Sequence, residues 1–269
     1  MIFKIEFSAA SDMGKVRKNN EDSCLLAPEF ELAIVADGVG GHNSGEVASS
    51  LAVKVTRDKY DSMKRTGMKP NPYNDKVSLE ANQLGFAVQL ANAVVYEAGA
   101  SGPENKGMGT TLSAALLNGS KLSIAHIGDS RIYLLRAGAM QQLTEDHSLV
   151  MEHVKKGLLT LEQAEVSPLQ NILTRALGTQ KTPAVDLVET ELEEGDRLLF
   201  CTDGLFKAVK ENKLQEMIKI QPDNAKACVE LVAAANANGG PDNITVIIGS
   251  VLKKPFKETL KDMFRKSYA

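Results

Sequence analysis

The 269-residue sequence has few cysteines and no long apolar run. Cys24, Cys201 and Cys228 are far apart and odd in number, so they build neither a disulfide framework nor a CxxC zinc motif. We expect them to be buried thiols in a protein of the reducing cytoplasm. No stretch approaches the ~18 apolar residues of a membrane span. The N-terminus lacks the apolar core of a signal peptide, so none is expected.

The sequence also lacks a large excess of either positive or negative charge. There are 34 acidic residues against 31 lysines and arginines, for a net charge of −3. A nucleic-acid-binding protein would need a basic excess, so that class is not expected. With 43% hydrophobic residues the chain can supply a core, and its length favours one large domain. No heptad pattern or broad apolar strip indicates obligate assembly, so a monomer is expected.

Motifs of several other hydrolase and nucleotide-binding classes are missing. No cysteine begins a Cys-x5-Arg loop, so a thiolate phosphatase is not expected. There is no GxxxxGK[ST] phosphate loop and no GxSxG serine elbow. The glycines at 38, 40 and 41 superficially resemble a dinucleotide-binding loop, but Asn43 stands where a third spaced glycine is required. With four histidines and no HExxH, zinc chemistry is not indicated.

Short apolar runs rich in β-branched residues alternate with turn-like segments, which predicts many strands. Asn118-Gly119 and Ala137-Gly138 indicate hairpins, and this clustering favours antiparallel sheets over a βαβ winding. Apolar rows of period 3.6 predict helices, one of them with Asp223 as N-cap and Gly239 as stop. The fold class is therefore an α+β sandwich. The predicted strands are 3–9, 23–27, 32–36, 110–117, 122–127, 131–136, 141–143, 186–191, 197–201 and 244–251, and the predicted helices are 45–64, 79–98, 211–218 and 224–238.

The most informative pattern is the placement of acidic residues at strand ends. Asp37, Asp129 and Asp203 each close an apolar strand, and Asp242 opens one. A single Asp-Gly pair is a common turn, but four such acids, together with Glu21-Asp22, are harder to explain as turns. Clustered carboxylates repel and desolvate one another unless a cation lies between them.

The type of ligand indicates which cation to expect. Oxygen ligands without cysteine or histidine partners favour a hard ion such as Mg²⁺ or Mn²⁺. Two such ions ~3.5–4 Å apart could hold a hydroxide for in-line attack on phosphorus. Glycine after Asp37 and Asp203 lets the backbone approach an ion. Arg17, four residues before Glu21, has the side chain that bidentate capture of a phosphoryl group requires.

The ordered set of motifs resembles the metal-dependent protein phosphatase 2C family in its bacterial branch. The resemblance covers roughly residues 5–251. Its motifs are SDMGKVRKNNEDS (11–23), VADGVGGHNSGEVAS (35–49), GTT (109–111), HIGDSRIYLLRAG (126–138), LTEDHSL (143–149), LTRALG (173–178), LLFCTDGL (198–205) and GGPDNITVII (239–248).

The resemblance implies an α-β-β-α sandwich, with two packed antiparallel sheets flanked by helices, in a domain spanning residues 1–252. It also implies Mn²⁺- or Mg²⁺-dependent hydrolysis of phosphoserine and phosphothreonine in proteins. A flap at roughly residues 144–175 would influence substrate access. Residues 253–269 form a basic tail.

The resemblance also implies site residues. Asp37 would bridge two metal ions, and Arg17 would bind phosphate. The complete implied set is catalytic Arg17, Asp37 and Asp203, substrate-binding Arg17, Thr111 and Asn243, and metal-binding Glu21, Asp22, Asp37, Gly38, Asp129, Asp203 and Asp242, with Asp129 at a third, weaker metal.

The sequence departs from the family pattern at two places. Some members carry a histidine two residues after the bridging aspartate, where this chain has Val39, so the general acid is left unassigned. The flap reads SPLQN at 167–171 where a His-Pro-Arg-like stretch is expected, and this bears on substrate preference.

The sequence leaves three hypotheses about function. The first is a catalytic phosphatase acting on phosphoproteins alongside a serine/threonine kinase. The second is a non-catalytic phosphoprotein-binding regulator, which predicts at least one lost metal acid, and none is lost. The third is a dedicated phosphatase of an anti-sigma antagonist or a secretion-system regulator, with the basic tail as a docking segment.

Overall fold

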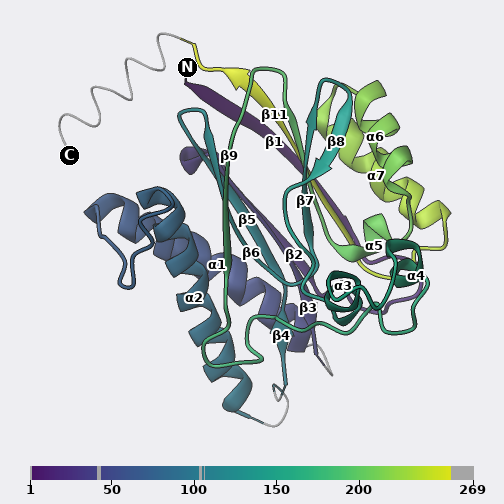
Figure 1. Cartoon of the computed structure of the whole chain (residues 1–269), viewed down its shortest axis with the longest axis horizontal. Coiled ribbons are helices and arrows are strands. Elements are labelled where there is room, and N and C mark those ends of the chain that lie inside the picture. Colours follow the sequence, from purple (N-terminus) through teal and green to yellow (C-terminus); the bar gives the residue numbers. More distant parts are fainter. Residues whose placement is uncertain (1, 41–43, 103–104, 106, 256–269) are drawn as a thin grey trace.

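The structure is a computed structural model, and it describes residues 2–40, 44–102, 105 and 107–255. Two antiparallel sheets lie face to face, and helices cover the outer face of each (Figure 1). This arrangement confirms the predicted α-β-β-α sandwich. No helix in the described ranges is long and apolar enough to cross a membrane.

The first sheet joins the two ends of the chain. Its strand order is β1 (Phe3–Asp12), β11 (Ile244–Lys253), β10 (Arg197–Cys201), β7 (Arg131–Arg136) and β8 (Ala139–Gln142). The second sheet runs β2 (Asp22–Ala27), β3 (Leu32–Val39), β5 (Leu112–Asn118), β6 (Lys121–Ile127) and β9 (Asp186–Glu191), and the short β4 (Gly109–Thr110) also pairs with β3.

The helices lie outside the two sheets or in connecting segments. The second sheet is covered by α1 (Ser44–Thr66) and α2 (Leu79–Ala100), and the first by α6 (Glu211–Ile220) and α7 (Asn224–Ala237) (Figure 1). The remaining helices are short: η1 (Pro28–Phe30), α3 (Leu149–Lys155), α4 (Leu161–Glu165) and α5 (Asp203–Phe206).

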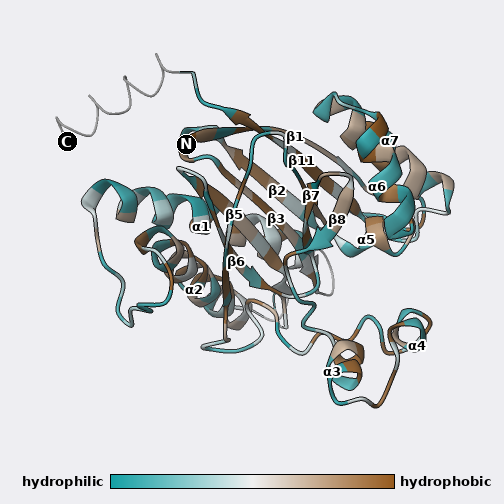
Figure 2. Ribbon diagram, turned by 45° about the horizontal axis from the view of Figure 1, so that its top comes forward, coloured by the Kyte–Doolittle hydropathy of each residue, from teal (hydrophilic) through white to brown (hydrophobic). Residues whose placement is uncertain are grey.

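Three apolar layers hold the sandwich together. One lies between α1, α2 and the second sheet, around Tyr60 and Leu84. Another lies between α6, α7 and the first sheet, around Leu231. The third lies between the two sheets and includes Phe200 and Ile124. The inner strands are accordingly hydrophobic on both faces, which explains why their sequences show little alternation (Figure 2).

Most predicted elements are confirmed, and both predicted hairpins join consecutive strands. Asp223 caps α7 by accepting a hydrogen bond from the Lys226 backbone N–H at 3.0 Å. The prediction of one strand over 110–117 is wrong in detail, because β4 ends at Thr110 and β5 begins at Leu112. Most of the predicted tail lies outside the described residues.

None of the helices predicted from the sequence lies in the flap, yet the flap contains α3 and α4. Both helices are short and each buries a single residue, so they carry no long apolar row. Their start signals are polar: Ser148 caps α3, and Thr160 with Gln163 forms a capping box at α4. Figure 2 shows both helices set apart from the body of the sandwich.

Candidate metal centre

Two of the predicted acids face each other across neighbouring strands. The β2–β3 register pairs Asp22 directly with Asp37. The backbone of Asp37 is fixed in turn, because its N–H donates to the Thr111 hydroxyl at 2.8 Å and its carbonyl accepts from the Thr110 hydroxyl at 2.8 Å. Sheet pairing therefore holds both carboxylates at the same end of the sandwich.

The opposite sheet brings Asp203 and Asp242 to this end. Asp203 begins α5 directly after β10, and Asp242 lies just before β11, the neighbouring strand. A side chain at position 204 would collide with the carbonyl oxygen of Asn243 and approach Asp242 Cβ to 3.4 Å. Gly204 thus permits the α5 turn to pack against the loop that carries Asp242.

One hydrogen bond links the two sheets at the site. The hydroxyl of Thr202 donates to Asp22 Oδ2 at 2.8 Å and accepts from the Thr245 backbone N–H at 3.0 Å. Asp22 therefore sits between β3 of one sheet and the β10–β11 pair of the other. Sequence reasoning placed Asp22 in a supporting position but did not single out Thr202.

Glu21 and Gly38 lie together beside the start of α1. The Gly38 N–H donates to the Glu21 carbonyl at 3.1 Å, and a Cβ at Gly38 would lie only 2.6 Å from that oxygen. A Cβ at Gly45 would lie 2.8 Å from the Glu21 carboxylate. Gly38 is required by the close approach of the Glu21 backbone, and Gly45 leaves room for the Glu21 carboxylate at the start of α1.

The remaining predicted residues are distributed around this end. Arg17 Nη2 donates to Asp242 Oδ2 at 2.8 Å, and 52% of its side chain is exposed. Asp129 is buried in the turn after β6. Thr111 and Asn243 make internal contacts: the Thr111 hydroxyl also meets Ser130 at 2.7 Å, and Asn243 Oδ1 accepts from the Glu21 N–H at 2.8 Å. Substrate binding by these two residues stays a prediction.

The acids act on one another electrostatically. Burial, followed by the charges of Asp22 and Asp203, raises the pKa of Asp37 well above its ordinary value. Burial likewise raises the pKa of Asp22 to about 7 and that of Asp129 to about 7, with Asp203 adding to both. Ionising these carboxylates together costs free energy, and a bound divalent cation would lower that cost.

Three further observations bear on whether a metal ion fits this site. Asp22 Oδ1 and Asp203 Oδ1 are buried and meet no hydrogen-bond donor in the described part of the chain. Within the same residues, however, no group of three or more histidine, cysteine or acidic side chains is arranged so that it could hold a metal ion. Basic side chains already contact two of the acids, Arg17 at Asp242 and Lys207 at Asp203. The oxygen donors and the unpaired buried atoms fit a hard divalent ion once these carboxylates turn toward it.

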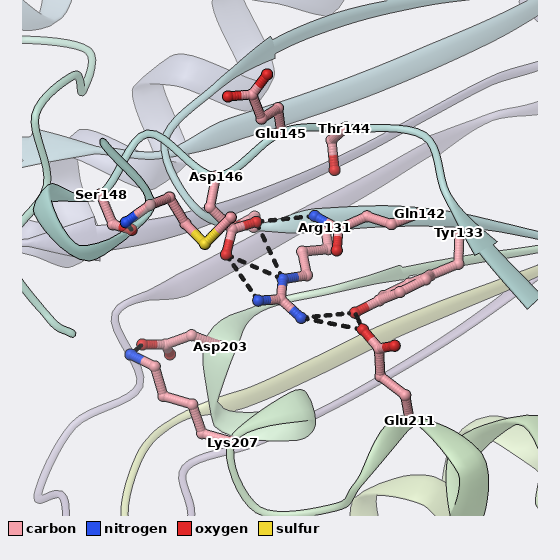
Figure 3. A network of polar contacts seen from close by, with 12 residues as sticks. Arg131, Tyr133, Gln142, Thr144, Glu145, Asp146, Ser148, Asp203, Lys207 and Glu211 are labelled. Atoms are coloured by element: carbon pink, nitrogen blue, oxygen red, sulfur yellow. Dashed lines mark hydrogen bonds and ion pairs between the residues drawn. The ribbon is translucent and has the colours of Figure 1, made fainter. Parts of the chain in front are cut away.

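Sequence reasoning missed two residues beside this site. Lys207 Nζ lies 2.6 Å from Asp203 Oδ2. Arg131 pairs with Asp146 at the start of the flap, at 2.7 Å (Figure 3). Its guanidinium lies 3.7 Å from the ring centroid of Phe206. For Lys207, the available signal was its i, i+4 spacing from Asp203 on a helix. The Arg131–Asp146 pair joins distant segments, and no local pattern indicates it.

Comparison with known proteins agrees with the fold and the motifs. Residues 15–233 match the family model of protein phosphatase 2C, and the chain belongs to this family. It is 36% identical over 256 residues to the serine/threonine protein phosphatase PstP of Mycobacterium tuberculosis, covering 95% of this chain but only 46% of that protein. The chain therefore spans about half the length of PstP.

Other relatives match along almost their whole length. The serine/threonine phosphatase stp of Listeria monocytogenes is 37% identical over 243 residues, covering 88% of this chain and 92% of stp. A crystal structure of the PstP catalytic domain in complex with two manganese ions superposes with a TM-score of 0.79 at 35% identity, covering 93% of this chain and 100% of that one. The resemblance inferred from the motifs is confirmed.

Proposed function

We propose that the chain is a divalent-metal-dependent protein phosphatase that hydrolyses phosphoserine and phosphothreonine. The observation that carries the proposal is that Asp22 and Asp37 from one sheet and Asp203 and Asp242 from the other lie at the same end of the sandwich, where their charges act on one another. The names of the relatives and the manganese ions of the PstP domain support the same reading.

The acidic side chains are proposed to hold the metal. Asp37, Asp203 and Asp242 would be direct ligands together with the Gly38 carbonyl, with Glu21 and Asp22 supporting them and Asp129 at a weaker position. Bound divalent ions would activate a water for in-line attack and neutralise phosphoryl charge. Thr202 keeps Asp22 oriented, and the Thr110 and Thr111 hydroxyls fix the backbone of Asp37.

Arg17 is proposed to bind the phosphoryl group. Its guanidinium is half exposed and already hydrogen-bonds Asp242. One N–H group of the planar guanidinium can therefore keep its hydrogen bond to Asp242 while other N–H groups face phosphate oxygens. The general acid stays unassigned.

The finer proposals concern context. The proposed substrates are phosphorylated proteins, and the proposed counterpart is a serine/threonine kinase. The chain is proposed to act as a monomer in the cytoplasm. Mn²⁺ and Mg²⁺ are both candidates for the ion. A dedicated phosphatase of an anti-sigma antagonist or of a secretion-system regulator is a narrower form of this proposal.

Substitution of one ligand tests the function. Asp203→Asn removes a ligand charge and should lower Mn²⁺-dependent hydrolysis of a phosphothreonine peptide by ~100-fold or more. Asp223→Asn is the matched control, because asparagine also caps a helix and Asp223 lies at α7. Undiminished turnover in Asp203→Asn would refute the site. Phosphoprotein binding without turnover by the wild type at saturating Mn²⁺ would instead indicate a non-catalytic regulator.

A further inference from the structure

Single side chains link the short helix α5 to the flap near both of the flap's ends. At the first end, Asp146 pairs with Arg131, whose guanidinium lies over the ring of Phe206 on α5. At the second end, Lys207 directly after α5 donates to Asn171 Oδ1 at 2.7 Å. The helix that begins with Asp203 is therefore linked to both ends of the segment expected to control access, through Arg131 at one end and Lys207 at the other.

Lys207 makes two contacts with one ammonium group. Its Nζ lies 2.6 Å from Asp203 Oδ2 and 2.7 Å from Asn171 Oδ1. The contact with Asp203 is largely shielded, with 23% of the lysine side chain and 12% of the aspartate side chain exposed. Figure 3 shows the lysine side chain extending back toward the Asp203 carboxylate.

The charge of Lys207 also acts on neighbouring acids. Its ammonium interacts electrostatically with the carboxylates of both Asp203 and Asp129. A fixed positive charge thus stands at the edge of the acidic cluster where Asp203 and Asp129 meet.

We propose that Lys207 is a positioning residue that provides a built-in cation at the outer oxygen of Asp203 and ties this metal-ligand carboxylate to Asn171 of the flap. The ammonium opposes binding of an additional divalent ion between Asp203 and Asp129, and its second hydrogen bond holds the flap near α5. The inference rests on the proposed metal-dependent function.

Two substitutions separate the two roles of Lys207. Lys207→Gln removes the charge and changes the flap contact, whereas Asn171→Ala removes the flap contact and leaves the charge. Lys207→Arg keeps the charge. Lys213→Gln is the matched control, because Lys213 is exposed on α6 and pairs only with Glu216 in the described structure.

The first readout is Mn²⁺ binding by isothermal titration calorimetry, which needs no substrate. Removing one unit charge from a partly shielded site should tighten the most weakly bound Mn²⁺ about tenfold in Lys207→Gln. Lys207→Arg, Asn171→Ala and Lys213→Gln should stay within about twofold of the wild type.

The second readout is the rate of cleavage by a protease that cuts after glutamate. The flap glutamates followed are Glu162 and Glu165 in α4, which are exposed and unaltered in all the variants. Loss of the single, partly exposed contact should speed cleavage about threefold in Asn171→Ala and Lys207→Gln and leave Lys213→Gln unchanged.

The outcomes separate this inference from the proposed function. Wild-type protein that binds no Mn²⁺ overturns both. Wild-type protein that binds Mn²⁺, with unchanged affinity in Lys207→Gln, overturns the role of Lys207 as a built-in cation. Unchanged flap cleavage in both Asn171→Ala and Lys207→Gln overturns the tie to the flap.

Discussion

The Asp22 carboxyl group illustrates how single residues are held in this site. One of its oxygens accepts the Thr202 hydroxyl, and the other meets no donor in the residues described. Burial raises its pKa to about 7, although the nearby hydroxyls of Thr245 and Thr202 work in the other direction. The group is therefore oriented but not neutralised by its protein neighbours, as expected for a side chain that supports a metal centre.

Thr202→Val should destabilise the protein without changing its shape. The substitution removes the hydroxyl that Asp22 and the Thr245 N–H share, and it leaves both without this buried partner. We expect a loss of about 2 kcal/mol in the free energy of unfolding, measured with urea. Thr182→Val at an exposed position is the control. Equal stability of the two variants would contradict the role given to Thr202.

Arg17→Ala should affect catalysis more than stability. The Arg17–Asp242 pair is exposed enough to contribute little to folding, so the melting temperature should hardly change. Loss of charge-assisted hydrogen bonds to phosphate should raise KM for a phosphopeptide about tenfold. Lys18→Ala on the same exposed segment is the control. An unchanged KM would remove Arg17 from the phosphate site.

At the scale of elements, the flap is joined to the sandwich by a shielded ion pair. Arg131 of β7 makes a multiply hydrogen-bonded contact with Asp146 and also reaches Tyr133 and Glu211 on its other side (Figure 3). The flap's first residues are thus fixed to the same strand pair that leads into α5. This arrangement gives the flap a rigid base.

Arg131→Met should be strongly destabilising. It leaves the Asp146 carboxylate, which is 7% exposed, without its partner, and the expected cost is about 3–5 kcal/mol. Arg65→Met is the control, because Arg65 is 74% exposed and its pair with Asp61 should contribute less than about 1 kcal/mol. Urea unfolding of the two variants makes the comparison. Similar losses would show that Arg131 is not an anchor.

The elements also show what local sequence could predict. Long amphipathic rows and hairpin turns located most helices and strands, because these signals reside in neighbouring residues. The strand ends located Asp37, Asp129, Asp203 and Asp242. Local sequence did not predict the roles of Thr202, Arg131 and Lys207, because their importance arises from partners distant in the chain or on the flap. It did not predict the short helices of the flap either, because their start signals are polar caps.

At the scale of the whole molecule, an apolar layer joins the two sheets, and acidic side chains from both sheets lie at one end. The acidic end opposes close packing of the sheets unless protons or cations are bound there. Without metal, the folded protein should keep protons on Asp22 and Asp129 up to about pH 7, since burial raises both of their pKa values to about 7.

Metal binding must displace these protons, so stabilisation by Mn²⁺ should depend on pH. Above about pH 7 the carboxylates are ready to bind, and below it protons compete. The rise in melting temperature on adding Mn²⁺ should therefore be several degrees larger at about pH 7.5 than at about pH 5.5. Comparing protein with and without Mn²⁺ at each pH cancels the titration of distant groups. An equal rise at both values would contradict protonated acids at the site.

The central claim is that acids from both sheets jointly hold divalent ions. Anomalous diffraction from crystals grown with Mn²⁺ tests it most directly, because each manganese position is located independently of the protein coordinates. The account predicts two strong peaks between Asp37, Asp203 and Asp242, with Asp37 in contact with both. Manganese at other places only, with these three carboxylates free of metal, would contradict it.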